Sequence, residues 1–363
     1  MIDEDILKFA HRVDQRATAL AEDMVRELRA SRAAILGKLA ALAADAGDNF
    51  DALPATRRKA LLEAQAQAVD AVLAQVYATA GDNLRDAGQD VIGATMTSTA
   101  EALVAATGVG AIAVGSGLTL DVTKAWFESS TVDGLLINDF LGKLQSSARD
   151  RIISAGRRAM IEGKGIQAAA RMIHQEGIEG SVPGLEGLAR TFCMSASNYA
   201  RDEIVKQKFS DVVQGWRRLA ALDGRTCIVC GSMDGKTYGL NDPKPSLPSH
   251  WRCRCMYMPI TVTWRSLGID IDEFDGGNQT TVKHNARTVH HKDGSTSTKF
   301  TVKEVGHVPA GTTYEGWMRQ QLDEDPTFVR SVLGKTRFEL FKSGKLSLSS
   351  MVTNGRVKRL SEL

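Results

Sequence analysis

Residues 222–255 read LDGRTCIVCGSMDGKTYGLNDPKPSLPSHWRCRC and contain four of the five cysteines of the chain. Cys227 and Cys230 form a C-x-x-C pair, a spacing that lets a tight turn present two thiolates to one ion. A second group follows further along the stretch and consists of His250, Cys253 and Cys255. Zinc takes four nitrogen or sulfur ligands in a tetrahedron, so the stretch predicts a structural metal site built from four of these five side chains.

Two other interpretations of this cluster stay open. In the first, no metal is bound, and packing and hydrogen bonds hold the thiols and the histidine together. In the second, the C-x-x-C pair is redox-active. The surroundings lack a thioredoxin-like βαβ pattern, which disfavours redox activity. A catalytic zinc keeps one position for water, whereas thiolates outnumber other ligands here, as they do in closed structural sites. We therefore expect no catalytic residue.

The loop between the two groups, residues 231–249, is rich in glycine and proline and has little apolar material. Ordering each residue costs roughly 1–2 kcal/mol of backbone entropy. We expect that burial alone does not offset this cost, and that an ion tying the two ends of the loop together supplies the missing stabilisation.

The first part of the chain has the apolar periodicity of long helices. In residues 4–45 apolar residues recur at steps of three, four and seven, which predicts one long helix. The segment GDNFDALP, residues 47–54, interrupts the pattern, and a second helix is predicted from about residue 55 to 80. Two long helices joined by a short turn pack antiparallel, so residues 1–90 are predicted to form a helical hairpin.

Residues 91–215 are predicted to be a second helical region. Within it, residues 102–120 (ALVAATGVGAIAVGSGLTL) form an uncharged run. Its length would nominally span a bilayer, but Gly, Ala, Ser and Thr insert poorly and favour close helix packing. We predict a buried, tightly packed segment, with transient membrane insertion and an oligomer contact as alternatives. From 135 to 220 the pattern is helical, and glycines are expected to divide it into short helices.

Residues 216–363 are predicted to be a smaller mixed α/β domain that carries the Cys/His cluster. Short alternating runs such as CMYMPITVTW indicate strands. Within 276–312, NARTVHH and STKFTVKEV flank KDGS, which predicts a projecting β-hairpin. The tail from residue 313 returns to helical periodicity. The predicted fold class is therefore α+β, with a long-helix all-α N-terminal region followed by this domain.

Composition sets broader limits on function. The chain has 363 residues and a formal net charge of +2, typical of a globular protein. Residues 1–200 hold 20 Lys+Arg against 25 Asp+Glu, whereas residues 201–363 hold 25 against 18. An excess this small is weak evidence for nucleic-acid binding. The first residues lack signal-peptide features, so we expect a reducing cytoplasm, no disulfide framework, and Cys193 as a small buried hydrophobe.

At this point the cluster resembles a known family. The run Asp223-Gly-Arg-Thr-Cys227, then Cys230, Asp234-Gly235-Lys236, Pro248, His250 and Cys253-Arg254-Cys255 looks like the hallmark of the phage Mu F-like family of minor head proteins. The upstream stretch GLARTFCMSASNYARDEIVKQKFSDVVQGW and the block from Tyr314 to Val352 are also similar to that family. Together the resemblance covers 187–260 and 313–363, about a third of the chain.

The resemblance implies a structural minor head protein of a tailed double-stranded DNA phage, assembled in the host bacterial cytoplasm and located in the virion. It implies a place at the portal vertex or capsid interior, with the portal protein or the major capsid protein as partner and packaged DNA as a further candidate contact. Asp223 and Arg225 are expected to orient the cluster, and Gly235 and Arg254 belong to the same supporting motif. The expected cofactor is one structural zinc ion.

Two functions of other classes remain as alternatives. A zinc-dependent nucleic-acid-binding module or nuclease would use the metal and the positive charge of residues 201–363. His290 and His291 lie in no recognisable nuclease motif, and we interpret them as surface or loop residues. A membrane-active ejection protein would rest on residues 91–120 alone.

Overall fold

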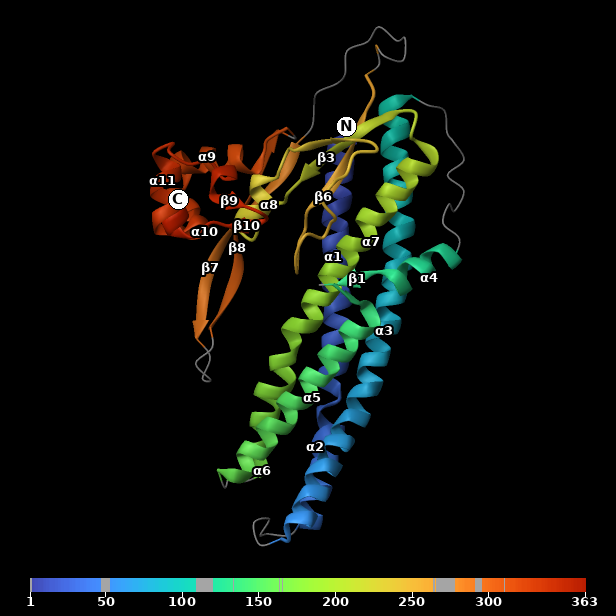
Figure 1. Cartoon of the computed structure of the whole chain (residues 1–363), viewed down its shortest axis with the longest axis vertical. Coiled ribbons are helices and arrows are strands. Elements are labelled where there is room, and N and C mark those ends of the chain that lie inside the picture. Colours follow the sequence, from blue (N-terminus) through green and yellow to red (C-terminus); the bar gives the residue numbers. More distant parts are fainter. Residues whose placement is uncertain are drawn as a thin grey trace.

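The long helices and the two three-stranded sheets lie in separate parts of the molecule, so the fold is α+β (Figure 1). The computed structural model describes residues 2–46, 53–108, 120–132, 134–162, 164, 166–263, 265, 278–290, 296–309 and 311–363. The predicted turn residues 47–52, most of the run 102–120 and the hairpin tip 291–295 with His291 lie outside these residues.

The N-terminal part is an elongated helical arm. Its first helices are α1 (Ile2–Ala30) and α2 (Arg32–Ala46), and α3 (Ala55–Thr107) runs back along them (Figure 1). The sequence predicted one helix over 4–45, whereas the helix is interrupted at Ser31. The hydroxyl of Ser31 donates to the carbonyl of Leu28 at 2.7 Å, while its backbone N–H and carbonyl keep their bonds to Glu27 and Ile35.

The predicted end of the second helix near residue 80 is wrong, because α3 continues to Thr107 and runs through the boundary expected at residue 90. Glycines in this stretch serve close packing instead of ending the helix. A Cβ at Gly88 would lie 2.9 Å from the Phe192 ring, which is fully buried. Among residues 91–107, those facing the other helices are buried in the core. No described helix is long and apolar enough to cross a membrane.

The arm is completed by further helices, and the short strands β1 (Thr131–Val132) and β2 (Leu135–Leu136) lie between the first and the second of them. The elements are α4 (Leu120–Ser129), α5 (Ile137–Ile161), α6 (Ile166–Met172), the π-helix η2 (Ile173–Ile178), the 3-10 turn η3 (Glu179–Ser181) and α7 (Val182–Lys208). The expected division of α7 by glycines is wrong. Gly184 and Gly187 lie inside it because each accepts a neighbouring side chain, Leu144 and Trp251 respectively.

The described C-terminal part holds two three-stranded sheets and a two-stranded one, in which β9 (Val352–Thr353) and β10 (Arg356–Val357) of the chain end pair. The first has the order β5–β3–β6, all antiparallel, with β3 (Val213–Leu219), β5 (Thr237–Gly239) and β6 (Met256–Thr261). The second has the order β4–β7–β8, with β4 (Leu222–Asp223), β7 (Asn278–His290) and β8 (Thr296–Pro309). β7 and β8 form a long antiparallel hairpin inside the range 276–312 (Figure 1). The helical pattern expected up to residue 220 is wrong from Val213, where β3 begins.

Short helices and turns close the chain. They are α8 (Ile228–Ser232), α9 (Tyr314–Glu324), α10 (Pro326–Leu333), α11 (Lys335–Lys342), η5 (Ser349–Met351), β9 (Val352–Thr353), β10 (Arg356–Val357) and η6 (Leu360–Glu362). The tail from residue 313 is thus helical up to Lys342, as its periodicity predicted.

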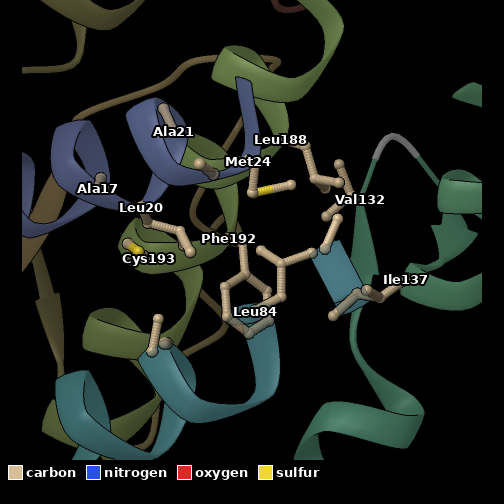
Figure 2. Packing of buried hydrophobic residues seen from close by; sticks show 14 of the residues in the cluster. Ala17, Leu20, Ala21, Met24, Leu84, Val132, Ile137, Leu188, Phe192 and Cys193 are labelled. Carbon is tan, nitrogen blue, oxygen red and sulfur yellow. The ribbon is translucent and has the colours of Figure 1, made fainter. Parts of the chain in front are cut away.

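The largest core lies inside the arm. Figure 2 shows side chains of α1, α3 and α7 meeting those of β1 and the start of α5. Cys193 is fully buried in this core, which confirms its interpretation as a small hydrophobe, and burial raises the pKa of its thiol to about 12. A second core gathers around Trp317 between α9, α10 and α11. Strand β3 borders the first core through Trp216, and Leu222 in β4 belongs to the second.

Glycine packing in the arm gives a direct test. A Cβ at Gly177 would lie 2.6 Å from Cγ1 and 2.9 Å from Cα of Ile152, whereas a Cβ at Gly142 would meet nothing within 4 Å. Gly177→Ala should lower the free energy of unfolding by about 1–3 kcal/mol through overpacking. Gly142→Ala should raise it by about 0.5–1 kcal/mol through helix propensity. Urea denaturation followed by the helical circular dichroism signal measures both, and equal shifts would contradict the packing described.

Candidate metal centre

The C-x-x-C pair is presented by a single turn. Cys227 precedes α8 with an extended backbone, and its Sγ accepts a hydrogen bond from the backbone N–H of Cys230 at 3.3 Å. The side chain of Cys227 thus caps the helix, as a polar N-cap residue does. Gly231 follows, and a Cβ there would lie 2.4 Å from the Tyr314 ring of α9. The turn is therefore held between the C-x-x-C thiols and the second core.

The second group of donors is formed by a tight turn. The backbone N–H of Cys253 donates to the carbonyl of His250 at 3.1 Å. Arg252, between them, has a φ of +62°, which a non-glycine residue rarely adopts. The N–H of Arg252 donates to Oγ1 of Thr191 on α7 at 2.9 Å, so the arm holds this backbone in place.

The structure brings all five predicted donors together. Nε2 of His250 lies 3.3 Å from Sγ of Cys227 and 3.1 Å from Sγ of Cys230. The sulfurs of Cys230 and Cys253 are 3.8 Å apart. The donors form two overlapping triads, Cys227–Cys230–His250 and Cys230–Cys253–Cys255, which share Cys230. Such a set of soft donors at this spacing can hold a metal ion.

The proton affinities in the cluster are shifted in both directions, since neighbouring thiols and burial raise the pKa values of Cys230 and Cys255. The pKa of Cys227 is lowered to about 4 by hydrogen bonds from the Cys230 thiol and from His250. The pKa of His250 is raised to about 10, chiefly by its bond to Cys227. Nδ1 of His250 lies 2.9 Å from the carbonyl of Trp251, which assigns the Nδ1–H tautomer to a neutral ring and leaves Nε2 facing the thiols. That orientation is the one a metal-bound imidazole uses.

Trp251 joins the cluster to the arm. Its ring lies against Gly187 of α7, where a Cβ would come within 2.3 Å of it. On another side it packs on Phe140 of α5, with ring centroids 5.1 Å apart. Only glycine leaves room for an indole this close to a helix backbone. The residues around His250 are thereby fixed relative to the helices.

The supporting residues predicted from the motif surround a buried ion pair. Nη2 of Arg254 donates to Oδ1 of Asp223 at 2.7 Å, and Nη1 bonds to Oδ2. The backbone N–H of Arg225 also donates to Asp223, at 2.8 Å. Burial alone would raise the pKa of Asp223, but the bonds from Arg254 and the charge of Arg225 hold it below its usual value. Asp14 of α1 lies 3.7 Å from Arg190 and 4.0 Å from Arg225, which connects this pair to the arm.

Gly235 occupies a turn that only a flexible residue forms easily. Its φ is +78°, in the left-handed region that favours glycine. The turn pairs with β3, since Gly235 N–H donates to the carbonyl of Arg218 and Arg218 N–H donates to the carbonyl of Lys236, both at 2.8 Å. Next to it, Asp234 accepts backbone bonds from Ala220 at 2.7 Å and Tyr314 at 2.6 Å, and burial raises its pKa to about 6.

The loop 231–249 has more anchors than its composition predicted. Nζ of Lys244 lies 4.3 Å from the centroid of the Trp216 ring and 2.5 Å from Oδ1 of Asp202 on α7. Leu247 packs against both the helical core and the cluster. These contacts add to whatever stabilisation an ion at the ends of the loop would supply. A lysine in a Pro-rich segment carries no sequence signal for such a contact, because its partners are distant in the chain.

Arg218 is a further residue at the cluster that the sequence did not single out. It lies fully buried on β3, and its Nη2 is 3.7 Å from Sγ of Cys230. The segment was expected to be helical. In a strand, side chains alternate between the two faces, so Arg218 lies on the same buried face as Trp216. This alternation is the sequence signal that could have identified Arg218.

The fold and the site define a protein with a long helical arm docked on a small α+β part that carries a Cys/His cluster. Residues 150–258 match the family model described as Phage Mu protein F like protein, a range that contains α7, β3 and all five donors. This region is similar to the phage Mu F-like protein family. The similarity supports a structural role in phage head morphogenesis in general terms. Comparison with curated proteins and with solved structures gives no match.

The buried ion pair predicts a pH-dependent contribution to stability. Asp223→Asn leaves Arg254 uncompensated in the interior and should lower the free energy of unfolding by about 3–5 kcal/mol near neutral pH. Because the folded-state pKa of Asp223 is depressed, its contribution is present above the unfolded pKa of about 3.9 and is lost as pH falls below it. The difference between parent and variant should therefore shrink on acidification.

Urea denaturation between neutral pH and about pH 3 measures this difference. Asp211→Asn, at an exposed position, is the control and should stay within about 0.5 kcal/mol of the parent. A constant gap between the parent and Asp223→Asn at all pH values would contradict the ion-pair account.

Proposed function

We propose that this protein is a structural minor head protein of a tailed phage, acting at the portal vertex or in the capsid interior during head assembly. The observation that carries the proposal is the family match over 150–258, which coincides with the segment that builds the Cys/His cluster and docks it on α7. In this role the chain binds other head proteins and has no turnover of its own.

The partner in this proposal is the portal protein, the major capsid protein or both. The long helical arm supports this, since its outer faces offer extended surface for packing against other helices (Figure 1). Exposed charges on α1 such as Arg26 are paired locally, here with Asp23. A protein partner would therefore be recognised by shape and by the pattern of charges along the arm more than by net charge.

Packaged DNA is a weaker candidate contact. Its support is the positive charge of residues 201–363. On the described part of the hairpin, however, Lys283 lies 3.0 Å from Glu304, and Lys303 pairs with Asp325. Lysines already paired with carboxylates release fewer counterions from DNA, so they contribute less to binding.

We further propose that the cluster binds one zinc ion with a structural role, through four of Cys227, Cys230, His250, Cys253 and Cys255. The support is the donor set itself, in which sulfur dominates and one imidazole presents Nε2. Structural zinc contributes on the order of 10 kcal/mol of binding free energy near neutral pH. Because the loop 231–249 has other anchors, this energy would stabilise the cluster and the adjoining second core more than the loop as a whole.

Placement in the particle is tested by electron microscopy of assembled heads. Particles made with the complete chain should show density for it against the portal or the inner capsid wall. Particles from a phage lacking the gene should lack that density and should assemble with a defect. Full infectious heads that form without the chain, together with its absence from purified particles, would contradict the proposed role.

Zinc binding is tested by elemental analysis of protein purified without chelator. One zinc ion per chain is expected in the parent, and Cys227→Ser and Cys230→Ser should lose it and melt at lower temperature. Cys193→Ala, which removes the buried thiol outside the cluster, should keep the ion. Affinity should fall as pH drops, since thiolate and imidazole ligands compete with protons. A parent without zinc, melting like both serine variants, would remove the metal from the proposal.

A further inference from the structure

A lysine near the cluster is held between aromatic rings and a carboxylate. Nζ of Lys244 lies 4.3 Å from the centroid of the Trp216 ring and 5.4 Å from that of the Tyr257 ring. It also lies 2.5 Å from Oδ1 of Asp202 on α7. Only 17% of the Lys244 side chain is exposed, although lysines usually extend into solvent. Lys244 therefore fixes one point of the loop 231–249 to β3, β6 and α7.

The segment around Lys244 depends on side-chain contacts for its order. Residues 243–249 include three prolines, which have no N–H to donate, and within the described chain they make no backbone–backbone hydrogen bond. Each ordered residue loses backbone entropy, so a segment without backbone bonds keeps one conformation only if side chains hold it. Lys244 is the only charged residue of this segment. Its contacts with the carboxylate and the rings are therefore the strongest polar anchor that the segment itself supplies.

The chain between Lys244 and the donor histidine is held at successive residues. The hydroxyl of Tyr257 donates to the carbonyl of Pro245 at 2.6 Å. Leu247 packs against the helical core and the cluster. Oγ of Ser249 accepts a hydrogen bond from Nη2 of the buried Arg218 at 3.0 Å. The path to the histidine is thus supported along its length.

The backbone after His250 is held as well. The ring of Trp251 lies against Gly187 of α7. The N–H of Arg252 donates to Oγ1 of Thr191, also on α7, at 2.9 Å. None of the hydrogen bonds and ring contacts named on either side uses a cysteine sulfur or the imidazole. They do not depend on an ion, so the fold alone can place the imidazole beside the thiols.

We propose that Lys244 is a positioning residue, which anchors the loop so that His250 faces the thiols before a metal ion binds. The inference rests on the proposed zinc binding and adds that the fold preforms the histidine side of the site. The affinity of a site falls in proportion to the fraction of molecules in which it is competent to bind. Releasing Lys244 would therefore weaken metal binding although Lys244 touches no donor atom in this account.

The order of the loop is tested by limited proteolysis of the full-length protein after its metal has been removed with a chelator. Lys244→Met keeps the apolar stem and removes the charge. If the loop then opens about tenfold more often, proteinase K should cut residues 240–249 about tenfold faster than in the parent. Lys244→Arg keeps a cation beside the rings and should restore most of the resistance. Mass spectrometry of the first fragments identifies the cuts.

Lys206→Met is the matched control. Nζ of Lys206 lies 2.9 Å from Oδ2 of the same carboxylate, that of Asp202, but Lys206 belongs to α7 and its side chain is 54% exposed. This variant removes an equal charge from the same carboxylate without changing the loop, and it should be cut like the parent. Cutting of Lys244→Met at the parent rate, or equal acceleration in both variants, would overturn the role of Lys244.

The consequence for the metal is measured by competition for zinc with a chromophoric chelator. Zinc affinity should fall about tenfold in Lys244→Met, in proportion to the loss of the ordered loop, and should recover in Lys244→Arg. Lys206→Met should bind zinc like the parent. Parent affinity in a Lys244→Met protein whose loop is cut faster would show that the ion itself places His250, and the proposal would then fail.

The outcomes keep the two proposals apart. A parent protein that binds no zinc overturns the proposed metal site and the positioning role with it. A parent that binds zinc, with all variants alike in both assays, overturns only the role of Lys244. If Lys244→Met does not fold, Asp202→Asn provides the test, because it keeps the lysine and removes the carboxylate that holds it. Asp202→Asn should show both effects in smaller size, and the absence of both would contradict the proposal.

Discussion

The contact between Gly187 and the Trp251 ring determines where the second group of donors lies. A side chain at position 187 would collide with the indole, so the close approach of this turn to α7 depends on a glycine in the middle of a helix. Three further bonds come from residues that follow Gly187 along α7. Thr191 accepts from the N–H of Arg252, and Asn198 bonds to backbone atoms of both Cys255 and Tyr257. One face of one helix thus positions a turn, the start of β6 and the donors between them.

The other side of the cluster is organised by the short chain segments around β3 and β4. Asp223, at the end of β4, holds Arg254, and its carbonyl accepts from the hydroxyl of Tyr314 on α9. Asp234 bonds to Tyr314 as well. The second core is therefore fastened to the same residues that support the thiols. A perturbation of the cluster should therefore affect α9 and its neighbours first.

Local chemistry was readable in the sequence, and long-range packing was not. The C-x-x-C pair, His250 and the C-x-C pair are close in the chain and have few ways to meet, so their spacing predicted the cluster. The continuation of α3 past residue 80 was missed because it depends on contacts with distant residues, such as the Phe192 ring, which fills the space left by Gly88. Arg218 was missed for a related reason: strand β3 was interpreted as the end of a helical pattern, and its buried face was not recognised. The anchors of Lys244 depend on partners that no local pattern specifies.

The packing of α1 against α7 has a consequence for how the chain is made. These helices lie about 180 residues apart in sequence, and residues of both belong to the same core. A ribosome adds about 5–20 residues per second, so α1 waits roughly 9–36 s before α7 emerges to cover its apolar face. During that interval α3 is already available to pack against the apolar face of α1. Together α1 and α3 must shield Val13, Leu20 and Met24 from contact with other polypeptide chains. The arm is thus completed late in synthesis, only shortly before the thiols of the cluster leave the ribosome.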